Sequence, residues 1–214
     1  MAKYEKPDFW SLKAQKEHYP ARSVYKLKEI DEKFRLFKHR AVQTPVFRVL
    51  DLGAAPGSWS LYVLRKYGKT GTQKSVPSLF LAAVDLLPLS QNFEQYTGEE
   101  FFFIQGDFTV SPVKDELIRQ GPYHVIMSDA APPTTGSRAV DTMRSLTLAE
   151  EVFSLAESCL YPGGSLAVKI FQGENTAALL KSLRERFESA KSFKPVSCRS
   201  NSFETYYVGL GKQS

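Results

Sequence analysis

Apolar runs and amphipathic stretches alternate along this chain from Val46 to its end. Short apolar runs separated by stretches of helical periodicity are typical of a mostly parallel sheet with helices on both faces. The pattern therefore predicts the α/β class with a seven-stranded sheet. The expected strands lie at residues 46–53, 79–87, 101–106, 123–129, 165–171, 194–199 and 205–211.

The intervals between these runs predict helices over residues 58–67, 89–96, 111–120, 140–160 and 175–189. Two further helical patterns, residues 8–17 and 21–37, precede the first strand and are separated at Tyr19-Pro20. The last two strands are joined by only residues 200–204, which is too short for a parallel crossover. We therefore expect an antiparallel hairpin at one edge of the sheet, and the polar residues 66–78 predict a surface loop.

Length and composition favour a single α/β domain. The chain has 214 residues, of which 43% are hydrophobic, including 15 Phe and 10 Tyr, so a sizeable core can form. No apolar run is long enough to span a membrane and no apolar segment follows the first residues, so a cytoplasmic protein is expected. Cys159 and Cys198 form no Cys-x-x-Cys pattern and the three histidines are scattered, so no metal site is expected.

The excess of positive charge is confined to the first 40 residues. Residues 1–40 contain eleven Lys and Arg against six Asp and Glu, whereas residues 41–214 contain seventeen of each. We therefore divide the chain into a basic helical extension, residues 1–40, and a larger domain, residues 41–214. Such a segment can follow a phosphate backbone and stack on bases, or it can pack its aromatic residues on the domain. The aromatic residues concerned are Tyr4, Phe9, Trp10, Tyr19 and Tyr25.

A turn of small residues ends the first strand. Gly53 and Gly57 permit backbone conformations and close approach that other residues do not, and Ala54 keeps the turn thin. The turn lacks the central glycine that lets a dinucleotide pyrophosphate settle on the helix, so a nucleoside without phosphates fits better. Asp51 stands at the carboxyl end of this strand, and Trp59 either lines a pocket or packs in the core.

Two carboxylates follow the next two strands. Ligands of open α/β sheets bind at the carboxyl ends of the parallel strands. Asp85 can there accept both hydroxyls of a ribose, and Asp107 can accept the exocyclic amine of adenine. Either one could instead be a helix cap. Together with the glycine turn they favour a nucleoside pocket.

A lysine lies inside the apolar run of the fifth strand. Burial of Lys169 is costly unless the amine is paired, and Asp129 at the end of the fourth strand is the natural partner. A structural ion pair is one interpretation. A functional site explains the cost better, because such a pair is a poor source of stability.

Seven stretches of the chain, in order, resemble the FtsJ-type (RrmJ-like) ribosomal RNA 2′-O-ribose methyltransferases. They are RSVYKLKEI (22–30), DLGAAPGSWS (51–60), DLLP (85–88), QGDF (105–108), SDAAP (128–132), VKIFQG (168–173) and SFETY (202–206). The resemblance implies a Rossmann-like methyltransferase fold, S-adenosylmethionine as cofactor and a catalytic tetrad of Lys26, Asp129, Lys169 and Glu204. It implies a cofactor site formed by Asp51, Gly53, Ala54, Pro56, Gly57, Ser58, Trp59, Asp85, Leu86, Asp107, Phe108 and Asp129.

The function that the resemblance implies is methylation of a ribose 2′-hydroxyl in RNA, foremost 23S-type ribosomal RNA of the large subunit. We expect the protein to act as a monomer. The same reaction on tRNA or an mRNA cap is an alternative. Two other classes are a methyltransferase acting on a small molecule or protein and a non-catalytic RNA-binding protein. Intact residues at all four tetrad positions disfavour the last of these.

Methyl transfer to a hydroxyl needs two aligned reactants and removal of the hydroxyl proton. Lys169 is the candidate base if it reacts as a neutral amine. If it stays charged, it orients the hydroxyl and Asp129 takes the proton. Lys26 belongs to the basic extension, so we expect that segment both to contact RNA and to complete the site, while Glu204 in the edge hairpin anchors a lysine.

Overall fold

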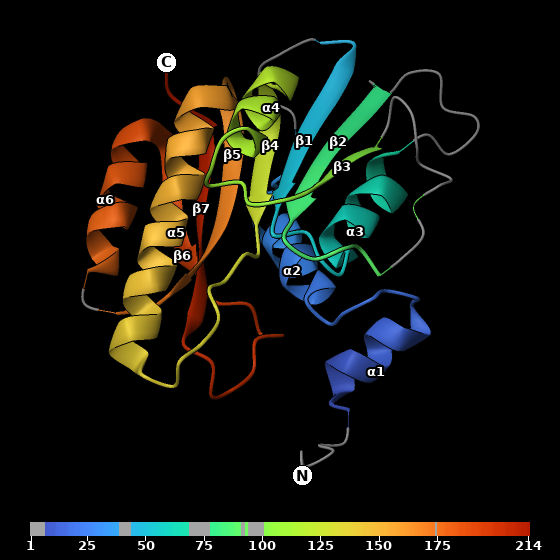
Figure 1. Cartoon of the computed structure of the whole chain (residues 1–214), viewed down its shortest axis with the longest axis vertical. Helices are drawn as coiled ribbons and strands as arrows, with labels where there is room; N and C mark the ends of the chain where they lie inside the picture. Colours follow the sequence, from blue (N-terminus) through green and yellow to red (C-terminus); the bar gives the residue numbers. More distant parts are fainter. Residues whose placement is uncertain (1–6, 39–43, 69–77, 91–92, 94–100, 174) are drawn as a thin grey trace.

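A computed structural model of the chain describes residues 7–38, 44–68, 78–90, 93, 101–173 and 175–214 (Figure 1). These residues contain a seven-stranded sheet in the order β3-β2-β1-β4-β5-β7-β6. Strands β1 to β5 pair in parallel, and β7 pairs antiparallel to both β5 and β6. The strands are β1 (Val46–Leu52), β2 (Ser78–Asp85), β3 (Phe101–Gln105), β4 (Tyr123–Ser128), β5 (Leu160–Phe171), β6 (Phe187–Phe193) and β7 (Glu204–Lys212).

Helices cover both faces of this sheet. Successive residues of a strand point to opposite faces, so apolar side chains in a run serve two cores. Val49 and Leu81 pack with α1, α2 and α3, whereas Leu50 and Ala82 pack with α4, α5 and α6. The helices are α1 (Phe9–Lys16), α2 (Val24–Phe34), α3 (Ser58–Tyr67), α4 (Val113–Gln120), α5 (Arg138–Cys159) and α6 (Thr176–Arg186). None of these described helices has the length and apolarity that crossing a membrane requires.

The predicted α/β class and the antiparallel edge hairpin are confirmed. The predicted sixth strand is wrong, because residues 194–199 lie in the loop that joins β6 to β7. Strand β6 instead occupies Phe187–Phe193, of which residues 187–189 were expected to end a helix and residues 190–193 were assigned to no element. Phe187 and Ala190 are its buried apolar residues, and their spacing of three matches a helix. The hydrogen-bonded pairing with β7 outweighs the helical preference that this spacing indicates.

Two sequence predictions fall mainly outside the described residues. These are the helix over residues 89–96 and most of the surface loop over residues 66–78. The basic extension is described from residue 7 to residue 38, and its helix α2 is part of the core. Val24, Leu27 and Ile30 are fully buried there against the sheet and α3. Figure 1 shows α2 below the ends of the parallel strands, near the middle of the view, and α1 farther down.

Candidate functional site

Strand register brings three of the predicted tetrad residues together. In the pairing of β4 with β5, Ser128 lies opposite Val168. The residues that follow, Asp129 and Lys169, are therefore neighbours at the carboxyl end of the sheet. Glu204 begins β7, the antiparallel neighbour of β5. Three segments that are distant in sequence thus deliver their charged groups to one place.

The fourth residue, Lys26, approaches from α2. Its Nζ donates to Glu204 Oε2 at 2.8 Å and lies 4.0 Å from Asp129 Oδ1. Lys169 Nζ lies 3.1 Å from the same Asp129 oxygen and also donates to the backbone carbonyl of Asp129. The four side chains are between 9% and 16% exposed. They form a continuous row of alternating charges, which we call the charge cluster.

A fifth side chain, Tyr206, belongs to this cluster and was missed in the sequence. Its hydroxyl donates to Asp129 Oδ1 at 2.6 Å. Burial raises the pKa of Tyr206 well above its usual value, and the Asp129 carboxylate adds to that effect. Tyr206 therefore remains a hydrogen-bond donor. Alternation along β7 could have revealed it, because Tyr206 follows Glu204 by two residues and side chains at that spacing share a face.

The charges of the cluster stabilise one another. Burial alone would raise the pKa of Asp129, but Lys169, Lys26 and the hydroxyl of Tyr206 hold that pKa below its usual value. Burial alone would lower the pKa of Lys26, but Asp129 and Glu204 hold that pKa above its usual value. Opposite charges at such distances favour the ionised forms of Asp129 and Lys26. At neutral pH Asp129 is a weak base and Lys26 is an ammonium group.

Two pockets meet at the charge cluster. The first, the strand-end pocket, has a volume of about 690 Å³ and includes Asp129 in its lining. The second, the lysine pocket, has a volume of about 510 Å³ and is lined by Lys26, Lys169 and Glu204. A molecule bound in each pocket would therefore present a reacting group to the same cluster.

Carboxylates at the ends of β2 and β3 line the strand-end pocket. Asp85 accepts hydrogen bonds from the backbone N–H groups of Ala55 and Leu87, each at 2.9 Å. Asp107 Oδ1 accepts from the N–H and the hydroxyl of Thr109. These bonds fix the carboxylates in place and leave lone pairs for a ligand, since each oxygen can accept more than one hydrogen bond.

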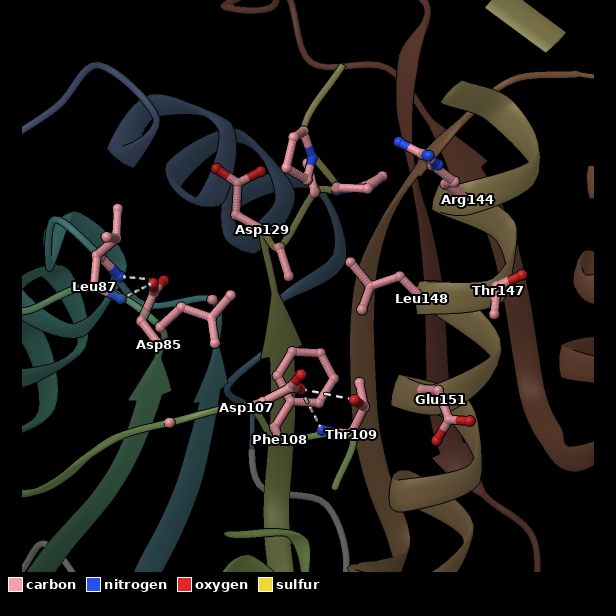
Figure 2. Close-up of a pocket in the computed structure, with 18 residues that line it drawn as sticks. Asp85, Leu87, Asp107, Phe108, Thr109, Asp129, Arg144, Thr147, Leu148 and Glu151 are labelled. Carbon is pink, nitrogen blue, oxygen red and sulfur yellow. Dashed lines mark hydrogen bonds between the residues drawn. The ribbon is translucent and has the colours of Figure 1, made fainter. Parts of the chain in front are cut away.

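The opposite side of the strand-end pocket is formed by α5. Figure 2 shows Asp85, Asp107 and Asp129 on the strand side, facing Arg144 and Glu151 on the helix. Carboxylates outnumber cations in the described lining, so phosphate groups are disfavoured. The pocket suits a nucleoside that carries positive charge rather than phosphates.

The predicted cofactor residues divide into two groups. Those in the pocket lining are Gly53, Asp85, Leu86, Asp107, Phe108 and Asp129. Those outside the lining are Asp51, Ala54, Pro56, Gly57, Ser58 and Trp59. The sequence could not separate these groups, because both belong to the same strand ends and turns.

The residues outside the lining, together with Gly53, determine the shape of the turn. Gly53 and Gly57 have φ angles of +77° and +107°, which only glycine adopts readily. A Cβ atom on Gly57 would meet the ring of Phe93 at 2.8 Å. Asp51 is fully buried and accepts the Ser60 hydroxyl at 2.7 Å. The glycines are thus required by backbone shape and packing.

Ser58 and Trp59 hold the extension on the domain. The Ser58 hydroxyl accepts the backbone N–H of Ala21 at 2.7 Å, and Trp59 Nε1 donates to the carbonyl of Ser23 at 2.8 Å. Both contacts lie just before α2 and so place Lys26. Trp59 is therefore packed against the extension and lies outside the lining of the strand-end pocket.

The other side of α2 is tied to the β6–β7 loop. The Glu29 carboxylate accepts the backbone N–H groups of Val196 and Ser197 at 2.6 and 2.9 Å. Arg22 donates to the carbonyl of Ser197 at 2.5 Å. The extension and the hairpin loop therefore form one wall of the lysine pocket. In the described part of the chain, no group of three or more His, Cys, Asp or Glu residues is placed to hold a metal ion.

Comparisons with known proteins agree on one family. The chain matches the family model described as FtsJ-like methyltransferase over residues 19–212. It is 47% identical over 208 residues to ribosomal RNA large subunit methyltransferase E of Treponema denticola, covering 97% of this chain and 96% of that protein. A protein of the same name from Borrelia garinii is 38% identical over 206 residues, with 96% and 97% covered.

A solved structure shows the same fold. The crystal structure described as a ribosomal RNA methyltransferase of Plasmodium falciparum superposes with a TM-score of 0.71 at 25% identity. The match covers 92% of this chain and 100% of that one. The arrangement of the sheet and helices is therefore one that methyltransferases use.

Proposed function

The chain belongs to the FtsJ-like methyltransferase family, and from that premise we propose that it methylates a ribose 2′-hydroxyl of large-subunit ribosomal RNA with S-adenosylmethionine. Its relatives are named ribosomal RNA large subunit methyltransferase E, and this name supports large-subunit ribosomal RNA as the substrate. The observation that carries the proposal is the meeting of two pockets at the charge cluster. The family resemblance found in the sequence is confirmed by the family match over residues 19–212.

The strand-end pocket fits S-adenosylmethionine by the chemistry of its lining. Asp85 and Asp107 offer acceptors for ribose hydroxyls and for an adenine amine. Leu86 and Phe108 provide apolar surface for the base. The surplus of carboxylates suits a cationic sulfonium compound that has no phosphate.

The lysine pocket fits a nucleotide of RNA. Arg22 and Arg199 in its lining can attract a phosphate, and Phe171 and Phe203 offer aromatic surface for a base. These two rings lie 4.8 Å apart between centroids. A ribose between these groups and the cluster would have its 2′-hydroxyl near the lysine amines.

The reaction requires that one proton be removed from the ribose hydroxyl. When bound, S-adenosylmethionine supplies a methyl group whose C–S bond breaks as the new O–C bond forms. Asp129 is a weak base because its pKa is held low, and Lys26 stays protonated between two carboxylates. We propose that Lys169 Nζ, which lies beside Asp129, takes the hydroxyl proton, and this role requires that the amine has released its own proton before the methyl group moves. Asp129 then positions the two lysines and Tyr206.

Mapping of 2′-O-methyl groups in ribosomal RNA tests this function in the cell. RNA from cells with and without the protein is compared position by position. We expect a ribose of large-subunit RNA to lose its methyl group when the protein is absent. Unchanged 2′-O-methylation of large-subunit ribosomal RNA would exclude the proposal.

A further inference from the structure

Among the described residues of the extension, one aromatic ring is largely exposed to solvent. Phe9 on α1 is 68% exposed and touches the edge of the Trp10 ring, with centroids 5.2 Å apart. The other aromatic residues described in the extension are buried or packed against the core. They are Trp10, Tyr19, Tyr25, Phe34 and Phe37. An exposed ring held in place by its neighbour offers a surface on which a base can stack.

A groove beside Phe9 leads to the lysine pocket. It has a volume of about 450 Å³ and lies between the start of α1 and the β6–β7 loop. Arg22, Arg199 and Asn201 line both the groove and the lysine pocket. The two cavities therefore share a wall of polar side chains. Figure 1 shows α1 at the same end of the molecule as this loop and α2.

The wall that the two cavities share contains two guanidinium groups, which favour binding of an anion. Arg22 is paired with Asp8, the residue that caps α1, so its position is fixed. Arg199 is exposed and has no ion pair among the described residues. Burial lowers the pKa of Arg22, and the nearby guanidinium of Arg199 lowers it further. A phosphate at this wall would relieve the repulsion between the two guanidinium groups.

We propose that this groove binds the RNA segment next to the methylated nucleotide, with a base stacked on Phe9 and a phosphate held by Arg199. The inference rests on the proposed function, since it takes the lysine pocket as the place of the target nucleotide. Every base has a flat face, so stacking on Phe9 contributes affinity and positioning without selecting a sequence. The extension thus contributes Lys26 to the chemistry and Phe9 to RNA binding.

Kinetics with variants of Phe9 test this contact. The substrates are large ribosomal subunits from cells that lack the protein, and the ribosomal RNA extracted from them. Phe9→Leu keeps apolar bulk but removes the ring, and should raise KM for RNA about tenfold, more than any change in kcat. Phe9→Trp should restore the KM of the original protein. Leu12→Ala, at a residue 53% exposed on the same helix, should leave KM unchanged.

Salt dependence tests the phosphate contact separately. Arg199→Gln should reduce the slope of log KM against log salt concentration by about 0.7, the value for one phosphate contact with single-stranded RNA. Phe9→Leu should leave this slope unchanged, because stacking involves no counterion. An unaltered slope in Arg199→Gln would remove Arg199 from the contact.

The outcomes distinguish this inference from the proposed function. If the original protein methylates RNA and Phe9→Leu has the same KM, the groove proposal is wrong while the function stands. If the original protein transfers no methyl group to either substrate, the proposed function fails and the groove proposal fails with it.

Discussion

Lys169 Nζ lies 3.1 Å from Asp129 Oδ1 and also donates to the backbone carbonyl of Asp129. The two residues follow paired positions of adjacent parallel strands, so strand register places them together. The same carboxylate oxygen accepts the hydroxyl of Tyr206 and lies 4.0 Å from Lys26. One nearly buried oxygen thus has a hydroxyl donor and two amines around it, and the loss of any of these partners disturbs the charge balance of the others.

The pair of Lys26 and Glu204 allows a test of that balance. Glu204→Leu leaves a buried ammonium group with one carboxylate fewer, and Lys26→Met leaves Glu204 unpaired. Each change should lower the free energy of unfolding by about 3 kcal/mol. The double variant should recover most of this stability yet stay inactive, because Lys26 is missing from the site. Urea unfolding and methyl-transfer assays on the four proteins measure both effects, and strictly additive losses would show that the two residues are not coupled.

Asp51 predicts an unusual dependence of stability on pH. Burial raises its pKa to about 7, and its Oδ1 has no hydrogen-bond partner in the described structure. The folded protein therefore keeps a proton that the unfolded chain releases near pH 4. Because the folded state binds the extra proton, the contribution of Asp51 becomes more destabilising as pH rises from about 4 to about 7.

Asp51→Asn should remove this effect. We expect the variant to resemble the original protein near pH 4 and to be more stable at pH 8, by up to about 4 kcal/mol. Urea unfolding of both proteins across this range, without cofactor, gives the two profiles. Parallel profiles would mean that Asp51 ionises in the folded state as it does in the unfolded chain.

Asp107 tests the assignment of the strand-end pocket. Asp107→Asn can keep an acceptor for Thr109 but replaces the other carboxylate oxygen by a donor. The affinity for S-adenosylmethionine should fall about tenfold or more, as expected when one hydrogen bond to a charged group is lost. Glu151→Gln is the matched control, because Glu151 lines the same pocket from α5. Titration calorimetry measures both, and equal losses would contradict the placement of the nucleoside beside β3.

A comparison of alanine substitutions at Gly53 and Gly136 distinguishes the cost of crowding from the cost of a left-handed backbone conformation. Both have positive φ, but a Cβ on Gly53 would come within 2.6 Å of Ala130, whereas Gly136 has nothing within 4 Å. Gly136→Ala should cost about 1 kcal/mol, the penalty of the left-handed conformation. Gly53→Ala should cost clearly more and shift the backbone that follows Asp129. Thermal unfolding of both variants measures the difference, and equal costs would mean that the turn tolerates the added methyl group.

Strands β1 to β5 were predictable because their apolar runs are bounded by polar turns. Strand β6 was not, since Phe187 and Ala190 have the spacing of a helix and only pairing with β7 reveals the strand. Its identity depends on a tertiary contact that no local pattern records. The antiparallel hairpin could still be predicted, because the short link before β7 excludes a parallel crossover.

The site residues differ in how far their placement could be predicted from the sequence. Asp129 and Lys169 could be paired from the order of their strands, whereas Lys26 and Glu204 came from the family resemblance. The packing role of Trp59 depends on where the extension docks, which the sequence of the turn does not determine. Tyr206 was missed because a tyrosine in a strand is usually a core residue.

Labelled methyl transfer with Lys169→Ala tests the assigned chemistry most directly. S-adenosylmethionine with a labelled methyl group is incubated with large ribosomal subunits from cells that lack the protein. The original protein should place the label on a ribose 2′-oxygen, and Lys169→Ala should lose activity at least about a hundredfold while binding the cofactor with unchanged affinity. Label on a base, or turnover by Lys169→Ala close to that of the original protein, would contradict the role assigned to Lys169 and its charge cluster.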